Sequence, residues 1–536
     1  MTQKRGFDRI SQAGKVPPPE TRVQILVVGA GSAGAAAAIV AARAGAHVML
    51  VDENPVDPGL MGFDTPLFYG GRYTGAIQTR GRMVEQVLAA NPLLEKAFEA
   101  GVDVRLGVSV WGAFTPGYGL ASLPGSIAGL ADETRAWMVG FDRLILATGA
   151  RDVALAFPGW SQTGVMGARA FETLVHTYDA FAGRRLVILG TGDLAVATAR
   201  TALAKGLEVA ALADVATTFG AGSQARAELE AAGVEIRLGQ VPVGAPGGLE
   251  GVTGIILRDL AGGGTEVLAC DTIVEGVSLT PVVELLDVLG GALAPDPRLG
   301  GYAPVSPDGV ATSLDGIFLA GDVAGVPGGA GLGPQAARAS GRRAALAALI
   351  SLGFEAEIEP HAAADATAAA DAVAYQALWT RALAQGEDVV ICQCEEVTRS
   401  QLIMARPPAY LGPASPAQAR RNLAGLLEDG PASQDQIKRL TRACMGPCQA
   451  RRCREQVAHL LAITAGVSAA DLALAGYRAP VRPLPLKVLA DWNESSEIAR
   501  YWDVWMGISG QWTPYDDIGT PREALSAGIL GEGGRL

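Results

Sequence analysis

Short apolar runs that end at glycine-rich turns recur along the N-terminal part of the chain. Gln24–Val28 (QILVV) leads into residues 29–34 (GAGSAG) and then into an alanine-rich segment. Arg185–Leu189 (RLVIL) leads into residues 190–195 (GTGDLA), with a helix expected from about Val196 to Lys205. A strand that enters such a turn and continues as a helix is typical of a dinucleotide-binding βαβ unit. The pattern therefore predicts two such units.

The first unit has the residue types that hold a pyrophosphate. Gly29 permits the tight turn, Gly31 lets the backbone approach the pyrophosphate, and Gly34 lets helix and strand pack closely. A second strand, His47–Val51, ends at Asp52, whose carboxylate can accept hydrogen bonds from an adenosine ribose. The residues predicted to contact the dinucleotide here are Gly29, Gly31, Ser32, Ala33, Gly34, Asp52 and Glu53.

The second unit departs from this pattern at two positions. Ala195 replaces the third glycine, which is tolerated where helix meets strand. Asp193 places a negative charge where an anionic pyrophosphate would pass. No arginine follows Asp214 at the end of the next strand, so NAD fits better than NADP. Two alternatives stay open: a nucleotide (NAD, or ATP/ADP) contacting Gly190, Gly192 and Asp214, or a retained fold that binds none.

Two later motifs carry a family resemblance. The predicted strand Leu144–Ala150 contains Ala147-Thr148-Gly149, and residues 312–322 read TSLDGIFLAGD. Together with the first fingerprint they resemble the flavoproteins with two dinucleotide domains, such as glutathione reductase and thioredoxin reductase. The resemblance implies FAD on the first fingerprint, with Gly321 and Asp322 at its ribityl–pyrophosphate region. The alternative role for Asp322 is that of a helix cap. The further residues assigned to the cofactor are Ala147, Thr148 and Gly149.

The cysteines are unevenly distributed. Cys270 is the single cysteine before residue 392, inside a predicted apolar strand, and we expect it to be a small buried hydrophobe. Disulfide reductases of the resembled family need a cysteine pair beside the flavin, so that activity is excluded. The four histidines are scattered, and no acid–base pair stands out near the motifs.

The other five cysteines lie in two short segments. Residues 392–398 read CQCEEVT, and residues 441–453 read TRACMGPCQARRC. Thiolates spaced C-x-C suit a shared metal centre, either zinc or an iron–sulfur cluster. The two segments resemble the bacterioferritin-associated-ferredoxin type of [2Fe–2S] domain, in the form fused to flavoprotein subunits of opine oxidase and hydrogen cyanide synthase. The predicted ligands are Cys392, Cys394, Cys448 and Cys453, with structural zinc as the alternative. Cys444 is a ligand, a spare thiol or a packing residue.

Residues near the cysteines indicate how their thiolates could be stabilised. Pro447 should stop any preceding helix, and a helix opening just after Cys448 would favour its thiolate through the helix dipole, with Cys453 one turn further in. Arginines nearby would offset a net negative cluster, or else form a solvated helix face. They are Arg439, Arg442, Arg451, Arg452 and Arg454.

The resemblance implies an electron-transfer subunit of a heteromeric amine or imino-acid dehydrogenase of the opine, sarcosine, hydroxyproline or glycine type. A smaller FAD-dependent subunit, similar to D-amino-acid oxidase, would oxidise the C–N bond. Further candidate partners are an electron acceptor and a small ferredoxin-like subunit. The main alternative is a free-standing NADH-dependent FAD/[2Fe–2S] reductase that feeds a carrier protein. An assembly subunit with an idle nucleotide fold is the third hypothesis.

Bulk properties limit the other function classes. The 536 residues are 49% hydrophobic and 18% charged, which indicates several packed domains. A net charge of −12 without a basic run argues against nucleic-acid binding. The N-terminus lacks the apolar core of a signal peptide and no run is apolar enough to span a membrane, so we expect a cytoplasmic protein.

The predicted fold class is α/β. It comprises two Rossmann-like domains of the glutathione-reductase type and a small helical [2Fe–2S] domain. The predicted boundaries are 1–22 for an N-terminal tail, 23–155 with 300–352 for the FAD-binding domain, 156–299 for the second nucleotide domain, 353–388 for a helical linker, 389–477 for the [2Fe–2S] domain and 478–536 for a Pro- and Trp-rich extension. The extension's aromatic residues should dock on the chain's own core or on a partner.

Overall fold

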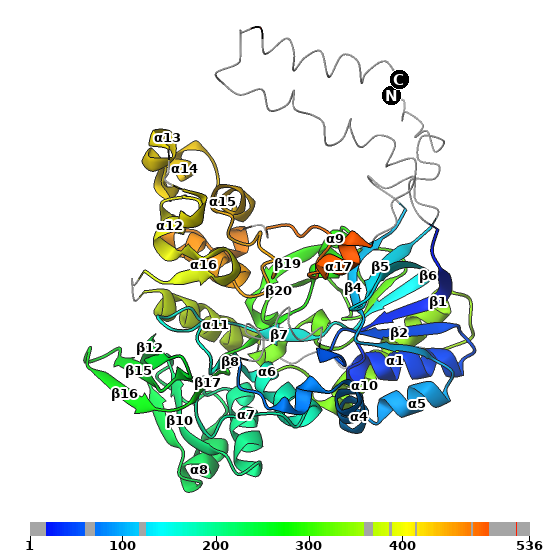
Figure 1. Ribbon diagram of the computed structural model, residues 1–536, viewed down its shortest axis with the longest axis horizontal. Coiled ribbons are helices and arrows are strands. Elements are labelled where there is room, and N and C mark those ends of the chain that lie inside the picture. Colours follow the sequence, from blue (N-terminus) through cyan, green and yellow to red (C-terminus); the bar gives the residue numbers. More distant parts are fainter. Residues whose placement is uncertain are drawn as a thin grey trace.

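The computed structural model describes residues 18–58, 70–116, 125–357, 368–384, 388–412, 415–472, 475–491 and 521. Most of the predicted N-terminal tail and the tryptophans of the C-terminal extension lie outside these residues. Figure 1 shows three parts: a sheet covered by helices at the right, a second α/β part below left, and a helical part above left.

The first α/β part is built on a seven-stranded sheet. Its central strands are parallel, in the order β3-β2-β1-β6, and β21 pairs with β6 outside this path. The antiparallel strands β5 and β4 extend the other edge. The strands are β1 (Thr21–Val28), β2 (Val48–Asp52), β3 (Asp103–Leu106), β4 (Ser109–Phe114), β5 (Ile127–Ala131), β6 (Ala136–Leu146) and β21 (Ile317–Leu319).

Helices cover this sheet because the parallel strands are apolar on both faces. Strands β1 and β2 are almost continuously buried, as expected for a parallel sheet between layers. Helices α1 and α10 pack so closely that a side chain at Gly341 would lie 2.0 Å from the Ala33 carbonyl oxygen. The elements are α1 (Ser32–Arg43), η2 (Gly75–Gln78), α4 (Arg80–Ala90), α5 (Leu93–Glu99), η5 (Gly321–Ala324), η6 (Pro327–Gly329) and α10 (Pro334–Ser351).

The second α/β part has a parallel five-stranded sheet in the order β11-β10-β9-β17-β8, beside the antiparallel sheet β12-β15-β16. Its strands are β8 (Val165–Gly167), β9 (Arg185–Leu189), β10 (Glu208–Asp214), β11 (Glu235–Leu238), β12 (Gln240–Gly244), β13 (Gly247–Gly248), β14 (Gly251–Val252), β15 (Gly254–Asp259), β16 (Thr265–Ala269) and β17 (Thr272–Glu275). Its helices are α6 (Ala168–Glu172), η3 (Thr173–Thr177), α7 (Asp193–Ala204) and α8 (Ser223–Ala231).

Two chain crossings join the α/β parts. Strand β7 (Ala150–Asp152) leaves the first sheet and pairs antiparallel with β18 (Leu279–Pro281), which returns from the second. Residues 153–160 continue from β7 towards the second part. The elements after β18 are α9 (Glu284–Val288), β19 (Leu293–Asp296), η4 (Pro297–Leu299) and β20 (Gly301–Pro304).

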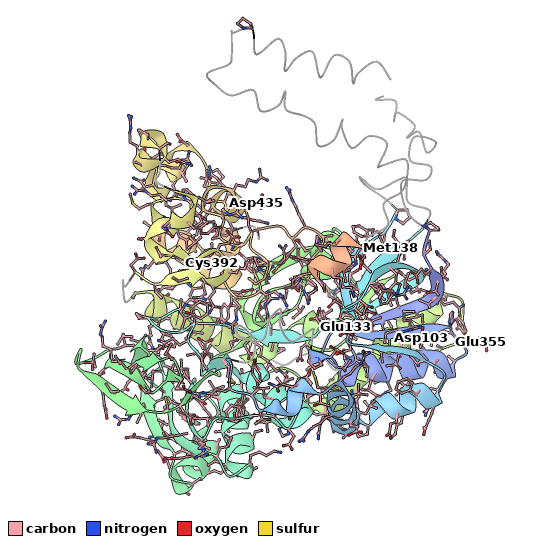
Figure 2. All side chains as sticks on the ribbon, viewed as in Figure 1. Asp103, Glu133, Met138, Glu355, Cys392 and Asp435 are labelled. Atoms are coloured by element: carbon pink, nitrogen blue, oxygen red, sulfur yellow. The ribbon has the colours of Figure 1, made fainter. Side chains whose placement is uncertain are left out.

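The C-terminal part is helical and carries the five clustered cysteines. Figure 2 places Cys392 in this part, away from Asp103 and Met138 of the first sheet. Its elements are α11 (Ala368–Leu383), β22 (Val390–Cys392), η7 (Gln393–Glu395), β23 (Val397–Thr398), α12 (Arg399–Ile403), η8 (Ala409–Leu411), α13 (Pro416–Arg420), α14 (Leu423–Asp429), α15 (Gln434–Thr441), α16 (Arg454–Ala465), η9 (Ala469–Asp471) and α17 (Leu486–Ala490). In these described ranges no helix is long and apolar enough to cross a membrane.

The predicted α/β class with two Rossmann-like units is confirmed, and several local predictions are wrong. Strand β6 ends at Leu146, so Ala147-Thr148-Gly149 follows the strand, and α7 begins at Asp193 instead of near Val196. Cys270 is buried as predicted, but it lies in the turn between β16 and β17. The domain boundaries stay a prediction.

Candidate cofactor sites

The first fingerprint is a close contact between the α1 turn and the end of β6. Gly29 has φ +103°, and a side chain there would lie 2.2 Å from the Ala147 carbonyl oxygen. A side chain at Gly34 would lie 1.8 Å from the Gly29 oxygen. Nothing lies within 4 Å of the side-chain position of Gly31, so the space that a pyrophosphate needs is open.

Asp52 braces this turn from the end of β2. Its Oδ2 accepts a hydrogen bond from Ala30 N at 2.7 Å, and its Oδ1 accepts one from Asn54 N at 2.8 Å. The side chain is buried, and burial raises the pKa of its carboxyl group. Both oxygens are therefore engaged by the backbone, while the next residue, Glu53, keeps a side chain that is 45% exposed.

Asp322 lies where strand β21 returns to the first sheet. Its Oδ1 accepts from Leu332 N at 2.7 Å, and its Oδ2 pairs with Arg169 Nη2 at 3.0 Å. It sits in the first turn of η5, whose N-cap is Ala320. Its pairing with Arg169 joins the first part to α6 of the second, and its role at the cofactor stays a prediction.

The Ala147-Thr148-Gly149 motif connects the two chain crossings. Thr148 Oγ1 donates to the Val282 carbonyl oxygen at 2.7 Å, and Val282 N donates to the Gly149 oxygen at 3.0 Å. These contacts hold the end of β6 against the strand that returns from the second part. Contact of these residues with FAD stays a prediction.

The second fingerprint has the same frame with different closing contacts. Thr191 Oγ1 donates to Asp214 Oδ2 at 2.7 Å and accepts from Gly220 N at 3.2 Å. Ala221 N donates to the Thr191 carbonyl oxygen at 2.9 Å. A loop before α8 therefore lies against the fingerprint turn. The side-chain position of Gly192 remains open, and Asp193 is exposed beside it.

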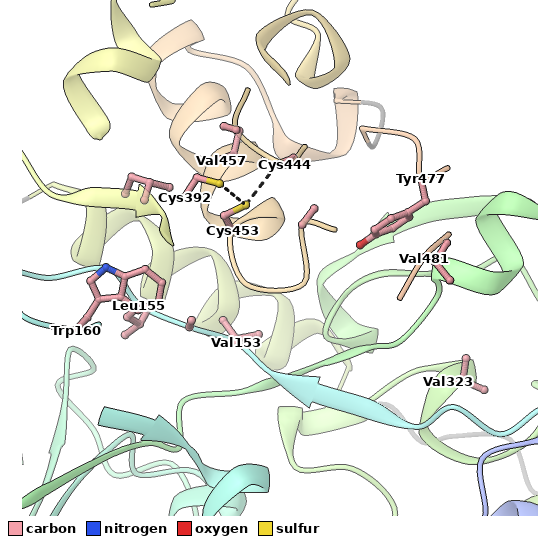
Figure 3. Close-up of a cluster of buried hydrophobic side chains, with 14 of the residues drawn as sticks. Val153, Leu155, Trp160, Val323, Cys392, Cys444, Cys453, Val457, Tyr477 and Val481 are labelled. Atoms are coloured by element: carbon pink, nitrogen blue, oxygen red, sulfur yellow. Dashed lines mark hydrogen bonds between the residues drawn. The ribbon is translucent and has the colours of Figure 1, made fainter. Parts of the chain in front are cut away.

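The two cysteine segments meet in the C-terminal part. Cys394 Sγ lies 3.4 Å from Cys448 Sγ. Cys453 Sγ lies 3.6 Å from both Cys392 Sγ and Cys444 Sγ. The dashed lines in Figure 3 mark these two contacts. A contact between the thiols of Cys392 and Cys394 joins the two groups. The five sulfurs form one continuous chain in the order 448, 394, 392, 453, 444.

Adjacent sulfurs of this chain are spaced like ligands of one metal centre. Sulfurs at ~2.3 Å from a tetrahedral metal lie about 3.8 Å apart, close to the observed separations. The neighbouring Cys392 thiol and burial raise the pKa of Cys394 to about 11, so crowding disfavours free thiolates. A cation or cluster would stabilise them. Among the described residues, no three cysteine, histidine or carboxylate groups converge as a preformed metal site, and ligation stays a prediction.

Unusual backbone geometry surrounds these sulfurs. Five of the seven non-glycine residues with positive φ in the described ranges flank the cysteines: Glu396, Arg442, Cys444, Gln449 and Ala450. Such conformations persist where surrounding contacts enforce them, and they concentrate at functional sites. Gly446 is also required here, because a side chain at that position would lie 2.5 Å from Cys394 Sγ.

The helix prediction at this centre is wrong. Helix α16 begins at Arg454, with Cys453 as its N-cap, because Gln449 and Ala450 adopt left-handed conformations that interrupt a helix starting after Cys448. The dipole argument therefore applies to Cys453 instead of Cys448. Cys444 lies at one end of the sulfur chain, where its sulfur contacts that of Cys453.

Comparison with known proteins identifies the family. The family model described as pyridine nucleotide-disulphide oxidoreductase matches residues 23–344, which contain both fingerprints. The chain belongs to this family. A second family model, the sarcosine oxidase A3 domain, matches residues 421–492. As a member of the pyridine nucleotide-disulphide oxidoreductase family, the chain is an FAD-dependent oxidoreductase.

Curated relatives extend the match into the cysteine region. An opine oxidase subunit of Agrobacterium tumefaciens is 27% identical over 496 residues, covering 87% of this chain and 91% of that protein. Hydrogen cyanide synthase subunit HcnB of Pseudomonas aeruginosa is 27% identical over 507 residues, covering 86% and 97%. The alpha subunit of sarcosine oxidase from Rhizobium meliloti is 29% identical, covering 59% of this chain and 30% of that one. The predicted resemblance to these subunits is confirmed, and the [2Fe–2S] centre stays a prediction.

Solved structures support the same architecture. L-proline dehydrogenase from P. horikoshii superposes with a TM-score of 0.57 at 19% identity, covering 88% of this chain and 81% of that one. At this identity the likeness concerns the fold. It reaches beyond the two nucleotide folds, since the pyridine nucleotide-disulphide oxidoreductase model ends at residue 344.

The arginines of the cysteine region are mostly not a solvated helix face. Arg454 is fully buried between the rings of Tyr302 and Tyr477, and Arg451 is 7% exposed. Arg452 Nη1 donates to Gln393 Oε1 at 2.9 Å, between the first two cysteines. Arg442 pairs with Glu395 at 2.6 Å. Arg439 does lie on a solvated helix face, as the alternative predicted, since its side chain is 68% exposed.

Sequence reasoning missed the buried ion pairs between the three parts. Arg151 of β7 pairs with Glu284 of α9 and lies 3.7 Å from Glu455 of α16. Arg482 pairs with Glu53 at 2.5 Å and lies 3.9 Å from Glu284. These Arg and Glu residues belong to no recognisable motif. The sequence offered one indication of buried ion pairs, which is that the charged residues interrupt otherwise apolar segments.

Proposed function

We propose that this chain is the electron-transfer flavoprotein and iron–sulfur subunit of a heteromeric amine or imino-acid dehydrogenase of the opine, sarcosine, hydroxyproline or glycine type. A smaller FAD-dependent partner subunit oxidises the substrate C–N bond. The observation that carries this proposal is the continuous chain of five sulfurs beside a two-dinucleotide fold. The names of the relatives, which are subunits of opine oxidase, sarcosine oxidase and hydrogen cyanide synthase, support it.

The chain's own residues have distinct roles in this proposal. The open space at Gly31 and the α1 N-terminus receive the FAD pyrophosphate. Cys392, Cys394, Cys448 and Cys453 hold a [2Fe–2S] cluster. Bound flavin supplies two-electron chemistry and a bound cluster supplies one-electron transfer. Arg452, which donates to Gln393 between two cysteines, offsets the negative charge of the thiolates.

The location of the centre is consistent with transfer between the parts. Figure 3 shows Cys453 and Cys392 above the segment that contains Val153, Leu155 and Trp160. Trp160 Nε1 donates to the Val390 carbonyl oxygen at 2.8 Å, which ties this segment to the strand that ends at Cys392. The same segment follows directly on β7, which leaves the FAD-binding sheet.

The ligand set is tested by five alanine variants of the full chain, purified anaerobically. Low-temperature EPR after dithionite should lose the [2Fe–2S] signal in Cys392→Ala, Cys394→Ala, Cys448→Ala and Cys453→Ala. Cys270→Ala is the matched control, because this cysteine is also buried but lies outside the cluster region, and it should retain the signal. Zinc instead of iron in the wild-type protein would overturn the electron-transfer function.

The Cys444→Ala variant tests whether the fifth cysteine is a cluster ligand. We expect the signal to persist, because the four predicted ligands, Cys392, Cys394, Cys448 and Cys453, do not include Cys444. Loss of the signal in Cys444→Ala together with its survival in Cys453→Ala would make Cys444 the ligand. The two residues are in contact, so their spectra should be compared in matched preparations.

The second candidate function is a free-standing NADH-dependent FAD/[2Fe–2S] reductase. The observation that favours it is the second fingerprint between strand β9 and helix α7, with open space at Gly192. The negative charge of Asp193 beside that space argues against it. Mixing the purified chain with NADH under anaerobic conditions separates the two functions. Rapid bleaching of the flavin would support the reductase, and no bleaching would support dependence on a partner subunit in the cytoplasm.

A further inference from the structure

The chain of five sulfurs has an inner end and an outer end. At the inner end, Cys392 and Cys453 are 0% and 1% exposed. Figure 3 shows both above the segment that contains Val153, which follows β7 and leads to the α/β parts. Cys394 alone of the five clustered cysteines is not buried. The sulfur chain therefore comes closest to solvent at Cys394.

A thin layer of backbone separates this outer end from the surface. A side chain at Gly446 would lie 2.5 Å from Cys394 Sγ and 2.9 Å from Glu395 Cγ, so the backbone here packs directly on the sulfur. Gly446 itself is buried, but both of its neighbours, Met445 and Pro447, are exposed. A protein that touches these two side chains comes within one residue of the Cys394 sulfur.

Further apolar side chains from η8 extend this surface. Tyr410 and Leu411 are each 55% exposed. The Tyr410 hydroxyl donates to Glu395, which follows directly on the exposed cysteine. Arg442 Nε donates to the Tyr410 hydroxyl at 3.1 Å, and Met445 N donates to the Arg442 carbonyl oxygen at 3.0 Å. These contacts gather exposed apolar side chains around the outer end. We call this surface the outer patch: Tyr410, Leu411, Met445 and Pro447.

The cation of Arg442 lies at the outer patch and meets solvent. Arg442 pairs with Glu395 at 2.6 Å, but the Arg442 side chain is 40% exposed and that of Glu395 is 6% exposed. Arg439, one turn earlier on α15, is 68% exposed, and its partner Asp435 is 40% exposed. Charges act over about 8 Å at physiological salt, so a partner on the outer patch responds to these cations more than to the chain's net charge of −12.

We infer that the outer patch is the docking surface for a one-electron carrier protein with an acidic contact surface. The apolar side chains form the centre of the contact, and carboxylates of the carrier pair with Arg442 and Arg439 at its rim. A small contact with an apolar centre and a polar rim is typical of transient electron-transfer complexes. The reduced centre gives one electron to the oxidised carrier at the Cys394 side, and no bond forms or breaks. This inference rests on the proposed function and adds the place where electrons leave the chain.

The test uses the full-length chain, reduced with dithionite and freed of excess reductant. Stopped-flow mixing with oxidised rubredoxin, a small acidic one-electron carrier, measures the transfer rate. Leu411→Glu and Met445→Glu should each slow this transfer about fivefold or more, because like charges then face each other. Arg439→Gln should slow it less and should reduce its dependence on salt. Leu249→Glu is the matched control, because Leu249 is fully exposed but lies in the second α/β part, and we expect the wild-type rate.

A carrier of opposite charge separates docking from damage to the centre. Cytochrome c is a basic one-electron carrier, and the two glutamate variants should accelerate transfer to it. A variant with a damaged centre would slow both carriers and would lose EPR signal. The inference is overturned if Leu411→Glu and Met445→Glu reduce rubredoxin at the wild-type rate, or if they slow both carriers alike while the EPR signal is intact.

Failure of the proposed function would look different. A wild-type chain without a [2Fe–2S] EPR signal contradicts the proposed function, and calorimetric titration with rubredoxin then tests the docking surface by binding alone. The wild type and Leu249→Glu should bind, and Leu411→Glu should bind about fivefold more weakly or less. Equal binding by all three, or no binding by the wild type, overturns the inference. A wild-type chain that has the signal but does not reduce rubredoxin overturns the inference and leaves the proposed function standing.

Discussion

In both nucleotide folds a helix packs closely against the end of a strand, but the glycine and the alanine at this contact are exchanged between the two folds. In the first, Gly34 of α1 faces Ala147 after β6, and a side chain at Gly34 would lie 3.0 Å from the Ala147 Cβ. In the second, Ala195 of α7 faces Gly276 after β17, and a side chain at Gly276 would lie 3.2 Å from the Ala195 Cα. Each contact therefore pairs one glycine with one alanine. The glycine is on the helix in the first fold and follows the strand in the second.

The folds also differ in what lies at the nucleotide edge. Asp52 binds the N–H of Ala30, whereas Asp214 binds the hydroxyl of Thr191, which also holds the loop at Gly220. Leu146 ends β6, and the equivalent position on β17 is the buried Glu275. The space beside the second glycine is open in both folds, and in the second fold the turn is also tied to the loop at Gly220. The motif alone does not distinguish these states.

The largest expected effect comes from breaking the packing rule in the first fold. Gly34→Ala places a methyl group 1.8 Å from the Gly29 carbonyl oxygen, and we expect a loss of about 3 kcal/mol or more in the free energy of unfolding, with loss of bound flavin. Ala195→Gly in the second fold should cost about 1 kcal/mol, the helix propensity difference. Urea unfolding and flavin content measure both.

Equal effects of these two substitutions would contradict the comparison. The double variant Gly34→Ala with Ala147→Gly tests whether the glycine and the alanine of this contact can be exchanged. Rescue should be partial, because the added methyl group still meets the Gly29 oxygen after the Ala147 Cβ is removed.

Glu275→Gln tests the buried carboxyl group of the second fold. Burial raises the pKa of Glu275 to about 8, above its ordinary value of 4.5. The folded chain therefore holds a proton that the unfolded chain releases, and stability falls as pH rises from about 4.5 to about 8. We expect the variant to match the wild type at pH 5 and to be more stable by up to about 3 kcal/mol at pH 8.

Gln keeps the oxygen that accepts from Leu155 N, so the substitution removes the titration and retains the hydrogen bond. Thermal unfolding at the two pH values is the measurement. A stability difference that is the same at pH 5 and pH 8 would show that Glu275 is not protonated in the folded chain.

Thr191→Ala tests the braced turn. The substitution removes the donor to Asp214 and the acceptor for Gly220 N, and we expect a cost of about 1–2 kcal/mol. Hydrogen exchange at Gly220 and Ala221 should accelerate. Thr198→Ala is the matched control, because this buried hydroxyl bonds only within α7, to Leu194 O. Unchanged exchange at Gly220 in the Thr191 variant would remove the bracing role.

The smallest effect concerns charge at the two helix starts. Asp193→Ser should tighten NAD binding to the second fold by about two- to fivefold, because a negative side chain no longer faces the pyrophosphate. The reciprocal Ser32→Asp should weaken FAD binding by a similar factor. Calorimetric titration measures both, and no NAD binding in either the wild type or Asp193→Ser would identify the second fold as idle.

Much of the fold was predictable because its signals are local. Each fingerprint combines an apolar strand, a turn that only glycine permits at Gly29 and Gly190, and a helix, and all of these are short-range requirements. The start of α16 was not predictable, because left-handed conformations at Gln449 and Ala450 follow from the crowded loop around the sulfurs and not from local propensity.

The sequence by itself determined the two nucleotide folds, the family and the five cysteines, since these depend on residue type and spacing. Only the tertiary structure decided the order of the sulfurs, the contact of Thr191 with Asp214 and the pairing of Arg482 with Glu53. These contacts join residues far apart in the chain. Their geometry depends on how whole layers pack, and no pattern along the chain records it.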